Sequence, residues 1–422
     1  MAPLRPPPPG PRVDAHVHVW APPSLAATKY PYHVQLIGTT ASAPPVDARV
    51  ERLATTVAAA ASSGNDNKTI GVLAVQAGCH QWDHSYLNDV LMAPPSGLRV
   101  AGCCLADPSR GAEAGVAALR ELAALQRGGN GAATTTSRNR LYRAVRFNPY
   151  LWPAHAEAPG VGRSADAAAD ADDRRVSGPT GRALFQAAGE LDLAACFMPF
   201  KGLAGVAADI ERLMDSSPQT RVVIDHYGFC AASRGRELLV GRGEGEWAVL
   251  ERWSRERPGQ VFVKASAAMR SSRQGFPHAD ASLYGLRWLV DAFGADRVMF
   301  GSDWPWVEDE GTFEAGAAAA AAAAAGDAVA AAAAAASAAG DWRPYGYEGA
   351  WRLSTDAASS GAAGDGFFFV SEEEEKGGGW KQRPMPAAKP LTEEEEAWVY
   401  GGTARALFPG AWEEEEEGGD GV

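Results

Sequence analysis

The sequence has little cysteine, no basic cluster and no long apolar run. Five cysteines occur among 422 residues without zinc-finger or redox spacing, so we expect buried free thiols. No basic patch is interleaved with aromatic residues, which predicts no nucleic-acid partner. The sequence contains no stretch long and apolar enough to predict a membrane span. The N-terminus has neither an apolar signal core nor a long amphipathic leader, which favours a cytoplasmic protein and leaves an organellar address open.

The formal net charge of −13 is concentrated near the C-terminus. Three runs of glutamate account for it, at 372–375, 393–396 and 413–417. The remainder of the chain is balanced in charge. The acidity therefore belongs to the C-terminal quarter and says little about the substrate.

Eight short apolar runs, many of them rich in valine, alternate with helical patterns. They are predicted as strands at 12–18, 71–76, 98–105, 142–148, 193–197, 221–226, 260–266 and 297–302. The runs are apolar on both faces, as in parallel strands that helices cover. Helical periodicity is clear at 112–126, 205–214 and 283–293. This alternation predicts an α/β fold with a single (β/α)8 TIM barrel.

The predicted barrel comprises residues 12–306 plus 391–410, the second range containing the closing helix. A Pro-rich tail at 1–11 precedes it. Residues 315–390 are rich in Ala, Gly and Glu, and their low complexity predicts a disordered insertion before the last helix. An acidic tail is expected at 411–422.

Three of the predicted strands end in residues that bind metals or move protons. His16 and His18 alternate with apolar residues, so they share one face of the first strand with Asp14. His226 ends the sixth strand, and Asp303 follows the eighth. Because barrel enzymes keep their chemistry at the C-terminal ends of strands, we expect these side chains to form one site. The alternatives are satisfied polar residues on the first strand, a core histidine at 226 and a helix cap at 303.

Cationic and polar side chains lie at the same ends of two other strands. Arg146 and Asn148 share a face of the fourth strand, Lys264 and Ser266 share a face of the seventh, and Arg270 lies just beyond. Cations in a barrel mouth suit a substrate that carries a carboxylate, so we predict these five residues as substrate-binding. The alternative is a buried salt bridge, for example between Lys264 and an inward carboxylate.

Several motifs resemble one known family. They are Val-Asp-Ala-His-Val-His at 13–18, Ala-Val-Arg-Phe-Asn at 144–148, Val-Ile-Asp-His-Tyr-Gly at 223–228, Val-Lys-Ala-Ser at 263–266 and Phe-Gly-Ser-Asp-Trp-Pro at 300–305. In this order they resemble the amidohydrolase-related (amidohydrolase 2) family of the metal-dependent hydrolase superfamily. The similarity is greatest to its lactonases for 2-pyrone-4,6-dicarboxylate, sulfomuconolactone and sugar lactones.

The resemblance implies that His16, His18, His226 and Asp303 line a hydrolase site. Many metal-binding relatives carry a further ligand on the fourth or fifth strand, where this chain has Asn148 and Cys196. The lactonase branch shares this reduced set, and some of its members are thought to work without metal. Two possibilities remain open: one divalent metal, zinc or manganese, on these four residues, or metal-independent chemistry.

The predicted function is hydrolysis of a small carboxylated lactone or related cyclic ester. Asp303 would take a proton from water, and the three histidines, or a metal they hold, would stabilise the oxyanion. One alternative is a metal-dependent decarboxylase of the same superfamily. Another is a barrel that binds a metabolite without turnover. The expected partner is a small anionic substrate, with no nucleic acid and no membrane, and the sequence does not predict the oligomeric state.

Overall fold

The computed structural model describes most of the predicted barrel. The described residues are 5–33, 44, 46–63, 70–127, 139–152, 175–229, 245–272, 278, 280–308, 346–351, 367–371, 380–384 and 389–412. Most of the predicted 315–390 insertion and of the acidic tail therefore lies outside them. Within the described residues, no helix is both long enough and apolar enough to span a bilayer.

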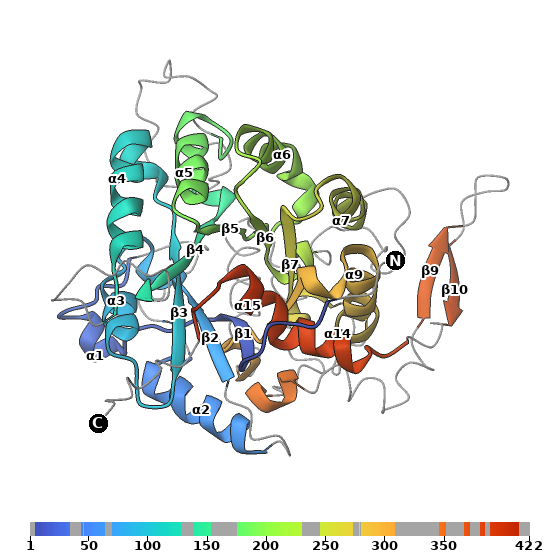
Figure 1. Ribbon diagram of the computed structural model, residues 1–422, viewed down its shortest axis with the longest axis horizontal. Helices are drawn as coiled ribbons and strands as arrows, with labels where there is room; N and C mark the ends of the chain where they lie inside the picture. The colour runs from blue at the N-terminus through green and yellow to red at the C-terminus, as the bar shows by residue number, and fades with distance from the viewer. Residues whose placement is uncertain are drawn as a thin grey trace, which may run out of the picture.

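Eight parallel strands form a barrel in simple chain order (Figure 1). They are β1 (Arg12–Val17), β2 (Ile70–Val75), β3 (Arg99–Leu105), β4 (Tyr142–Phe147), β5 (Ala194–Phe197), β6 (Val222–Ile224), β7 (Val261–Ser266) and β8 (Val298–Gly301). The predicted TIM barrel is confirmed, and the strands follow the expected bounds to within two residues. The valine-rich runs form strands because branched side chains fit a pleated surface buried on both faces.

Helices surround the barrel on its outside, except the last, which covers one end of the barrel interior (Figure 1). They are α1 (Pro23–Ala26), α2 (Val50–Ser63), α3 (Ser85–Met92), α4 (Gly111–Ala124), α5 (Pro179–Glu190), α6 (Ala207–Ser216), α7 (Gly245–Glu256), α8 (Ala268–Ser271), α9 (Leu286–Phe293), α14 (Glu393–Ala397) and α15 (Thr403–Leu407). Each of the longer helices buries one apolar stripe. In α9 that stripe is Leu286, Leu289, Val290 and Phe293, and the helix ends at Gly294. The expected helix at 283–293 is thus present from residue 286 onward, after the π-helical turn η7 (Asp280–Gly285).

The barrel interior is packed with apolar side chains. Val13, Ala15, Leu73, Ala101, Cys103, Ala144, Ala194, Cys196, Val223 and Met299 are buried in this inner cluster. A larger cluster fills the space between strands and helices. Cys103, Cys104 and Cys196 are free and buried, as expected from their apolar surroundings, whereas Cys79 is partly exposed.

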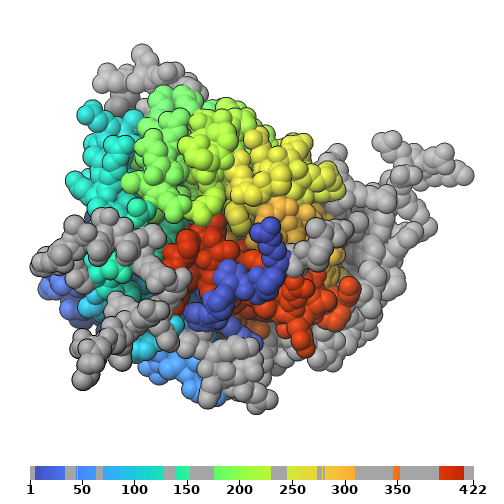
Figure 2. Space-filling model, viewed as in Figure 1, coloured from blue at the N-terminus to red at the C-terminus, as the bar shows by residue number. Residues whose placement is uncertain are grey.

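The N-terminal segment lies against the closing helices. Figure 2 shows its first described residues in blue across the red C-terminal elements. Arg405 of α15 donates to the carbonyl oxygens of Pro8 (Nε to O, 2.9 Å) and Pro11. Trp398, which begins η10 (Trp398–Gly402), donates from Nε1 to the carbonyl oxygen of Arg5 (2.9 Å). Both ends of the described chain therefore meet beside β1 and β8.

Within the range predicted as an insertion, two parts are described. Residues 346–351 are helical, and the Trp351 ring lies 4.3 Å from the Phe300 ring of β8, centroid to centroid. Tyr347 from the same helix is buried. The strands β9 (Phe367–Ser371) and β10 (Trp380–Pro384) pair as an antiparallel hairpin. The remainder of 315–390 is outside the described residues.

The barrel closes where β8 meets β1. An isolated parallel bridge joins Val17 to Trp304. Across it, the Asp303 amide donates to the His16 carbonyl (2.9 Å), and the His18 amide donates to the Trp304 carbonyl (2.7 Å). Gly301 permits this approach, because a Cβ there would lie 2.7 Å from the Cβ of His16. We refer to this junction of residues 14–18 with 301–304 as the β1–β8 seam.

A buried carboxyl group crosses the same seam. Asp14 Oδ1 accepts the backbone N–H of His16 (3.0 Å) and that of Ser302 (2.9 Å). The Asp14 side chain thus provides an acceptor for one backbone N–H on each side of the seam. Burial raises the pKa of Asp14 to about 6.

The first prediction concerns Gly301. Replacing it with Ala should lower the free energy of unfolding by about 1–3 kcal/mol, because the added methyl group overpacks against His16 and Ser266. Urea denaturation measures the loss. Gly205→Ala is the matched control, since a Cβ at Gly205 meets no atom within 4 Å. Equal effects of the two substitutions would contradict a tight seam.

The second prediction concerns Asp14. Asp14→Ala should lower the free energy of unfolding by about 1–3 kcal/mol, because two buried N–H groups lose their acceptor. The control is Asp291→Ala, which removes an exposed carboxylate and should change stability by less than about 0.5 kcal/mol. Chemical denaturation measures the free energy of unfolding of both variants. An unchanged value for Asp14→Ala would show that the seam does not need this acceptor.

Candidate active site

Four predicted side chains converge at the C-terminal end of the barrel. Asp303 Oδ1 lies 3.7 Å from His16 Nε2, 3.5 Å from His18 Nε2 and 3.9 Å from His226 Nε2. All four residues are buried. The structure therefore brings together residues that are nearly 300 positions apart in the chain.

Unusual backbone conformations direct two of these side chains. His226 begins the short helix η6 (His226–Phe229), where His226, Tyr227 and Gly228 all have φ between 53° and 67°. Asp303 has φ 65°. Such angles are rare for residues with a Cβ and cluster at functional sites. They turn the chain sharply after β6 and β8.

The two histidines of β1 belong to a continuous chain of hydrogen-bonding contacts. His18 Nδ1 lies 2.9 Å from the carbonyl oxygen of Val75, to which it can only donate. His18 Nε2 is 3.3 Å from His16 Nε2. His16 Nδ1 in turn lies 3.3 Å from Lys264 Nζ.

Three buried charged residues, Asp225, Lys264 and Arg146, form a cluster next to the Nδ1 side of His16. Asp225 Oδ1 is 3.0 Å from Lys264 Nζ and 3.5 Å from His16 Nδ1, and Asp225 Oδ2 is 3.4 Å from Arg146 Nε. Burial disfavours the charge of Asp225, but Lys264, His16 and Arg146 hold its pKa well below the usual range. Burial also opposes the charge of Lys264, whose pKa Asp225 nevertheless raises. Both partners are therefore ionised at neutral pH.

Burial sets the protonation state of His16 and of His226. Burial, with the charge of Lys264 adding to it, holds the pKa of His16 well below its usual range. Burial also lowers the pKa of His226 to about 4. His226 is held by two hydroxyl groups: Ser266 Oγ is 2.8 Å from its Nδ1, and Ser271 Oγ donates to its carbonyl oxygen. Both imidazoles are neutral near pH 7.

Arg270 holds the other oxygen of the Asp303 carboxylate. Its Nε donates to Asp303 Oδ2 (2.9 Å), and its guanidinium lies 5.3 Å from the centroid of the Trp306 ring. Burial alone would raise the pKa of Asp303, but Arg270 and His226 hold it below the usual range. The Arg270 side chain is 20% exposed, in contrast to Lys264, which is fully buried.

The other predicted substrate-binding residues make contacts within the protein. Asn148 Oδ1 accepts the N–H of Tyr150, as in a helix cap. Arg146 contacts Met198 and Asp225. Lys264 takes up the salt bridge that was its alternative interpretation, and Ser266 contacts His226. Among the five, Arg270 therefore has the most direct contact with the central carboxylate.

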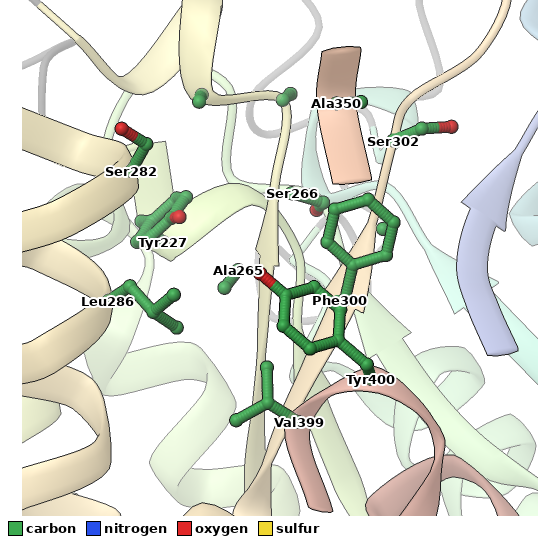
Figure 3. A pocket seen from close by; sticks show the side chains of 13 residues that line it. Tyr227, Ala265, Ser266, Ser282, Leu286, Phe300, Ser302, Ala350, Val399 and Tyr400 are labelled. Atoms are coloured by element: carbon green, nitrogen blue, oxygen red, sulfur yellow. The ribbon is translucent and has the colours of Figure 1, made fainter. Parts of the chain in front are cut away.

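A small cavity lies behind the site between β7, β8 and η10 (Figure 3). Tyr227, Ser266, Phe300, Ser302 and Tyr400 are among its lining residues. Its volume is about 30 Å³. Ligand pockets usually measure hundreds of cubic ångströms, so this cavity is too small for an organic substrate.

The site has the donor chemistry of a metal centre. Ligand atoms of His16, His18 and Asp303 lie within 4.8 Å of one another. Two imidazole nitrogens and one carboxylate oxygen form a set that suits zinc with an open position for water. His226 does not belong to this group of three, although it faces Asp303. The fit requires a lone pair on Nε2 of both His16 and His18.

Two residues of this network were not among the predicted site residues. Asp225 lies beside Nδ1 of His16, and Asp14 accepts backbone N–H groups across the β1–β8 seam. Both lie within motifs that the sequence analysis quoted. In the sequence, each is a charged residue within an apolar run, and a buried charge requires a partner. The sequence does not name that partner, because it lies on another strand.

Three solved structures are similar to this chain, and the first of them supports the fold. An amidohydrolase from Burkholderia multivorans crystallised with zinc is 17% identical, with a TM-score of 0.52 over 94% of this chain and 99% of that one. A putative 2-pyrone-4,6-dicarboxylic acid hydrolase from Pseudomonas putida is 24% identical, with a TM-score of 0.46 over 70% and 83%. The IDCase of Metarhizium anisopliae is 14% identical, with a TM-score of 0.46 over 94% and 97%. No curated protein matches the sequence significantly.

The family model described as "Amidohydrolase" matches residues 13–339, which is more than half of the chain. The match includes all eight barrel strands from Val13 onward and all four convergent residues. The resemblance expected from the sequence motifs is confirmed, and this chain belongs to the amidohydrolase family.

Proposed function

We propose that this enzyme hydrolyses a small carboxylated lactone or a related cyclic ester by activated water. The observation that carries the proposal is the position of Asp303. One carboxylate oxygen faces three imidazoles at 3.5–3.9 Å, and the other is held by Arg270. This combines a proton acceptor with a neutral imidazole, His226, that can polarise a carbonyl.

Asp303 is proposed to accept a proton from the attacking water. Its ionised state at neutral pH follows from the nearby Arg270, whose charge is the largest influence that lowers the pKa of this carboxyl group against burial. The bond to Arg270 fixes the carboxylate and leaves Oδ1 toward the histidines. A water at Oδ1 would be close to any carbonyl carbon bound beside His226.

His226 is proposed to stabilise the oxyanion. The neutral ring can donate from Nε2 when Ser266 donates to Nδ1, and that contact is 2.8 Å long. Its low pKa keeps it from being a competing cation at neutral pH. Donors fixed before the reaction starts contribute most to such stabilisation. When bound at His16, His18 and Asp303, a divalent metal would add Lewis-acid polarisation and lower the pKa of water.

Arg270 is proposed to bind the substrate carboxylate. It is 20% exposed and lies against Trp306, whereas Arg146 and Lys264 are buried against Asp225. A guanidinium has several N–H donors, so one group can contact Asp303 while others face a ligand.

A metal-dependent decarboxylase is the second candidate. The convergence of two histidine nitrogens and one carboxylate oxygen within 4.8 Å favours it, because such a reaction would need a firmly held metal. Lactone turnover after treatment with a chelator would favour the lactonase. Release of carbon dioxide from the carboxylate of an acidic substrate only in the presence of zinc or manganese would favour the decarboxylase.

The third prediction tests the proposed base. Asp303→Asn should reduce kcat for lactone hydrolysis by roughly 10²- to 10⁴-fold, because an amide cannot accept the proton from water. A panel of carboxylated lactones is assayed with and without chelator. Asp291→Asn changes an exposed carboxylate and should leave kcat unaltered. Full activity in a folded Asp303→Asn protein would refute the proposal.

The fourth prediction separates binding from chemistry. Arg270→Met should raise KM for a carboxylated lactone by about 10-fold or more, since a charge-assisted hydrogen bond contributes about 1.5–3 kcal/mol. The KM for an uncharged lactone of similar size should change much less. A parallel rise for both lactones would assign Arg270 to holding Asp303 rather than to recognising the substrate.

A further inference from the structure

His16 has two neutral forms, and they differ in what the site can bind. With the proton on Nδ1, both Nε2 atoms of the β1 pair present lone pairs toward Asp303. With the proton on Nε2, His16 donates to His18 across 3.3 Å and its Nε2 cannot bind a metal. The partner of Nδ1 therefore decides which form prevails.

Two oppositely charged groups compete for that Nδ1. Lys264 Nζ lies 3.3 Å away and can only donate to it. Asp225 Oδ1 lies 3.5 Å away and can only accept from it. The contact with Asp225 is at the long limit for a hydrogen bond, and Asp225 is itself drawn to Lys264 at 3.0 Å and to Arg146. The geometry favours donation from Lys264.

This choice completes the chain of contacts without a conflict. Lys264 donates to His16 Nδ1, His16 Nε2 donates to His18 Nε2, and His18 Nδ1 donates to the Val75 carbonyl. Every nitrogen in the chain then has one defined role. The opposite form would set two lone pairs against each other at 3.3 Å, a repulsion that a bound cation would relieve.

We propose that Lys264 is a positioning residue that holds His16 in the Nε2–H form and thereby weakens the affinity of His16, His18 and Asp303 for a divalent cation. Asp225 has the opposite effect, because its carboxylate stabilises the form with the proton on Nδ1, from which it would accept, and it attracts a cation. The buried pair is thus a determinant of metal dependence. The ammonium group is fully buried, so it exerts this effect from within the protein rather than on the substrate. The proposal goes beyond the reaction itself, since metal affinity is measured without substrate.

Zinc titration of the full-length protein tests the proposal. After dialysis against a chelator, isothermal titration calorimetry with ZnCl₂ should show that Lys264→Met binds zinc about 10- to 100-fold more tightly than the wild type, the range seen when a metal ligand's supporting contact changes. Asp225→Asn should bind zinc more weakly by a similar factor. Lys389→Met, at an exposed lysine, is the control and should match the wild type.

Nitrogen NMR provides a second measurement, the ¹⁵N chemical shifts of His16. These would not change if Lys264 had only a structural role. In the metal-free wild type, ¹⁵N shifts should show His16 protonated on Nε2, with the signal assigned by its loss in His16→Gln. In Lys264→Met the proton should move to Nδ1. The wild-type spectrum alone tests the proposal if a variant fails to fold: a proton on Nδ1 of His16 would overturn it.

Weaker or unchanged zinc binding in a folded Lys264→Met protein would also overturn the proposal. These outcomes are distinct from those of the lactone panel. A protein that hydrolyses no lactone could still show the predicted zinc affinities, and an active lactonase could fail to show them.

Discussion

The seam between β1 and β8 is the contact on which the candidate site depends. Backbone hydrogen bonds across it fix the His16 and His18 segment against Asp303, and Gly301 leaves room for the approach. Asp14 satisfies one backbone donor on each side. A shift of one residue at this junction would turn the histidines away from the carboxylate, since neighbouring side chains of a strand point to opposite faces. The geometry of the chemistry is therefore set by barrel closure.

Much of this arrangement could be predicted from the sequence. The strands are short apolar runs, and this pattern can be recognised in the sequence without knowing which residues pack against it. Chain-order topology then brings the ends of the first, sixth and eighth strands to one rim, which is why His16, His18, His226 and Asp303 could be grouped. The predicted bounds were least accurate at β6, where the chain leaves the strand early for the left-handed turn at His226.

The partners of the charged residues could not be predicted in the same way. Lys264 and Arg146 were expected to bind substrate, and both lie against Asp225. Asn148 Oδ1 accepts the N–H of Tyr150, a contact that the strand pattern did not indicate. A strand pattern indicates which face a side chain occupies, but its partner depends on the register between strands and on depth in the barrel. The helix at 346–351 could not be predicted either, because low complexity masked the aromatic residues that pack on Phe300.

The position of the seam also has a consequence for how the enzyme forms. Every other neighbouring strand pair is joined by one crossover, whereas β1 and β8 are separated by almost the entire barrel sequence. Closing so long a loop costs more entropy than any local pairing, and the contact gains nothing until the intervening strands are ordered. A partly folded intermediate that lacks this junction would contain both halves of the histidine–carboxylate cluster but not the cluster itself. Catalytic competence should consequently emerge only in the final, cooperative step of folding.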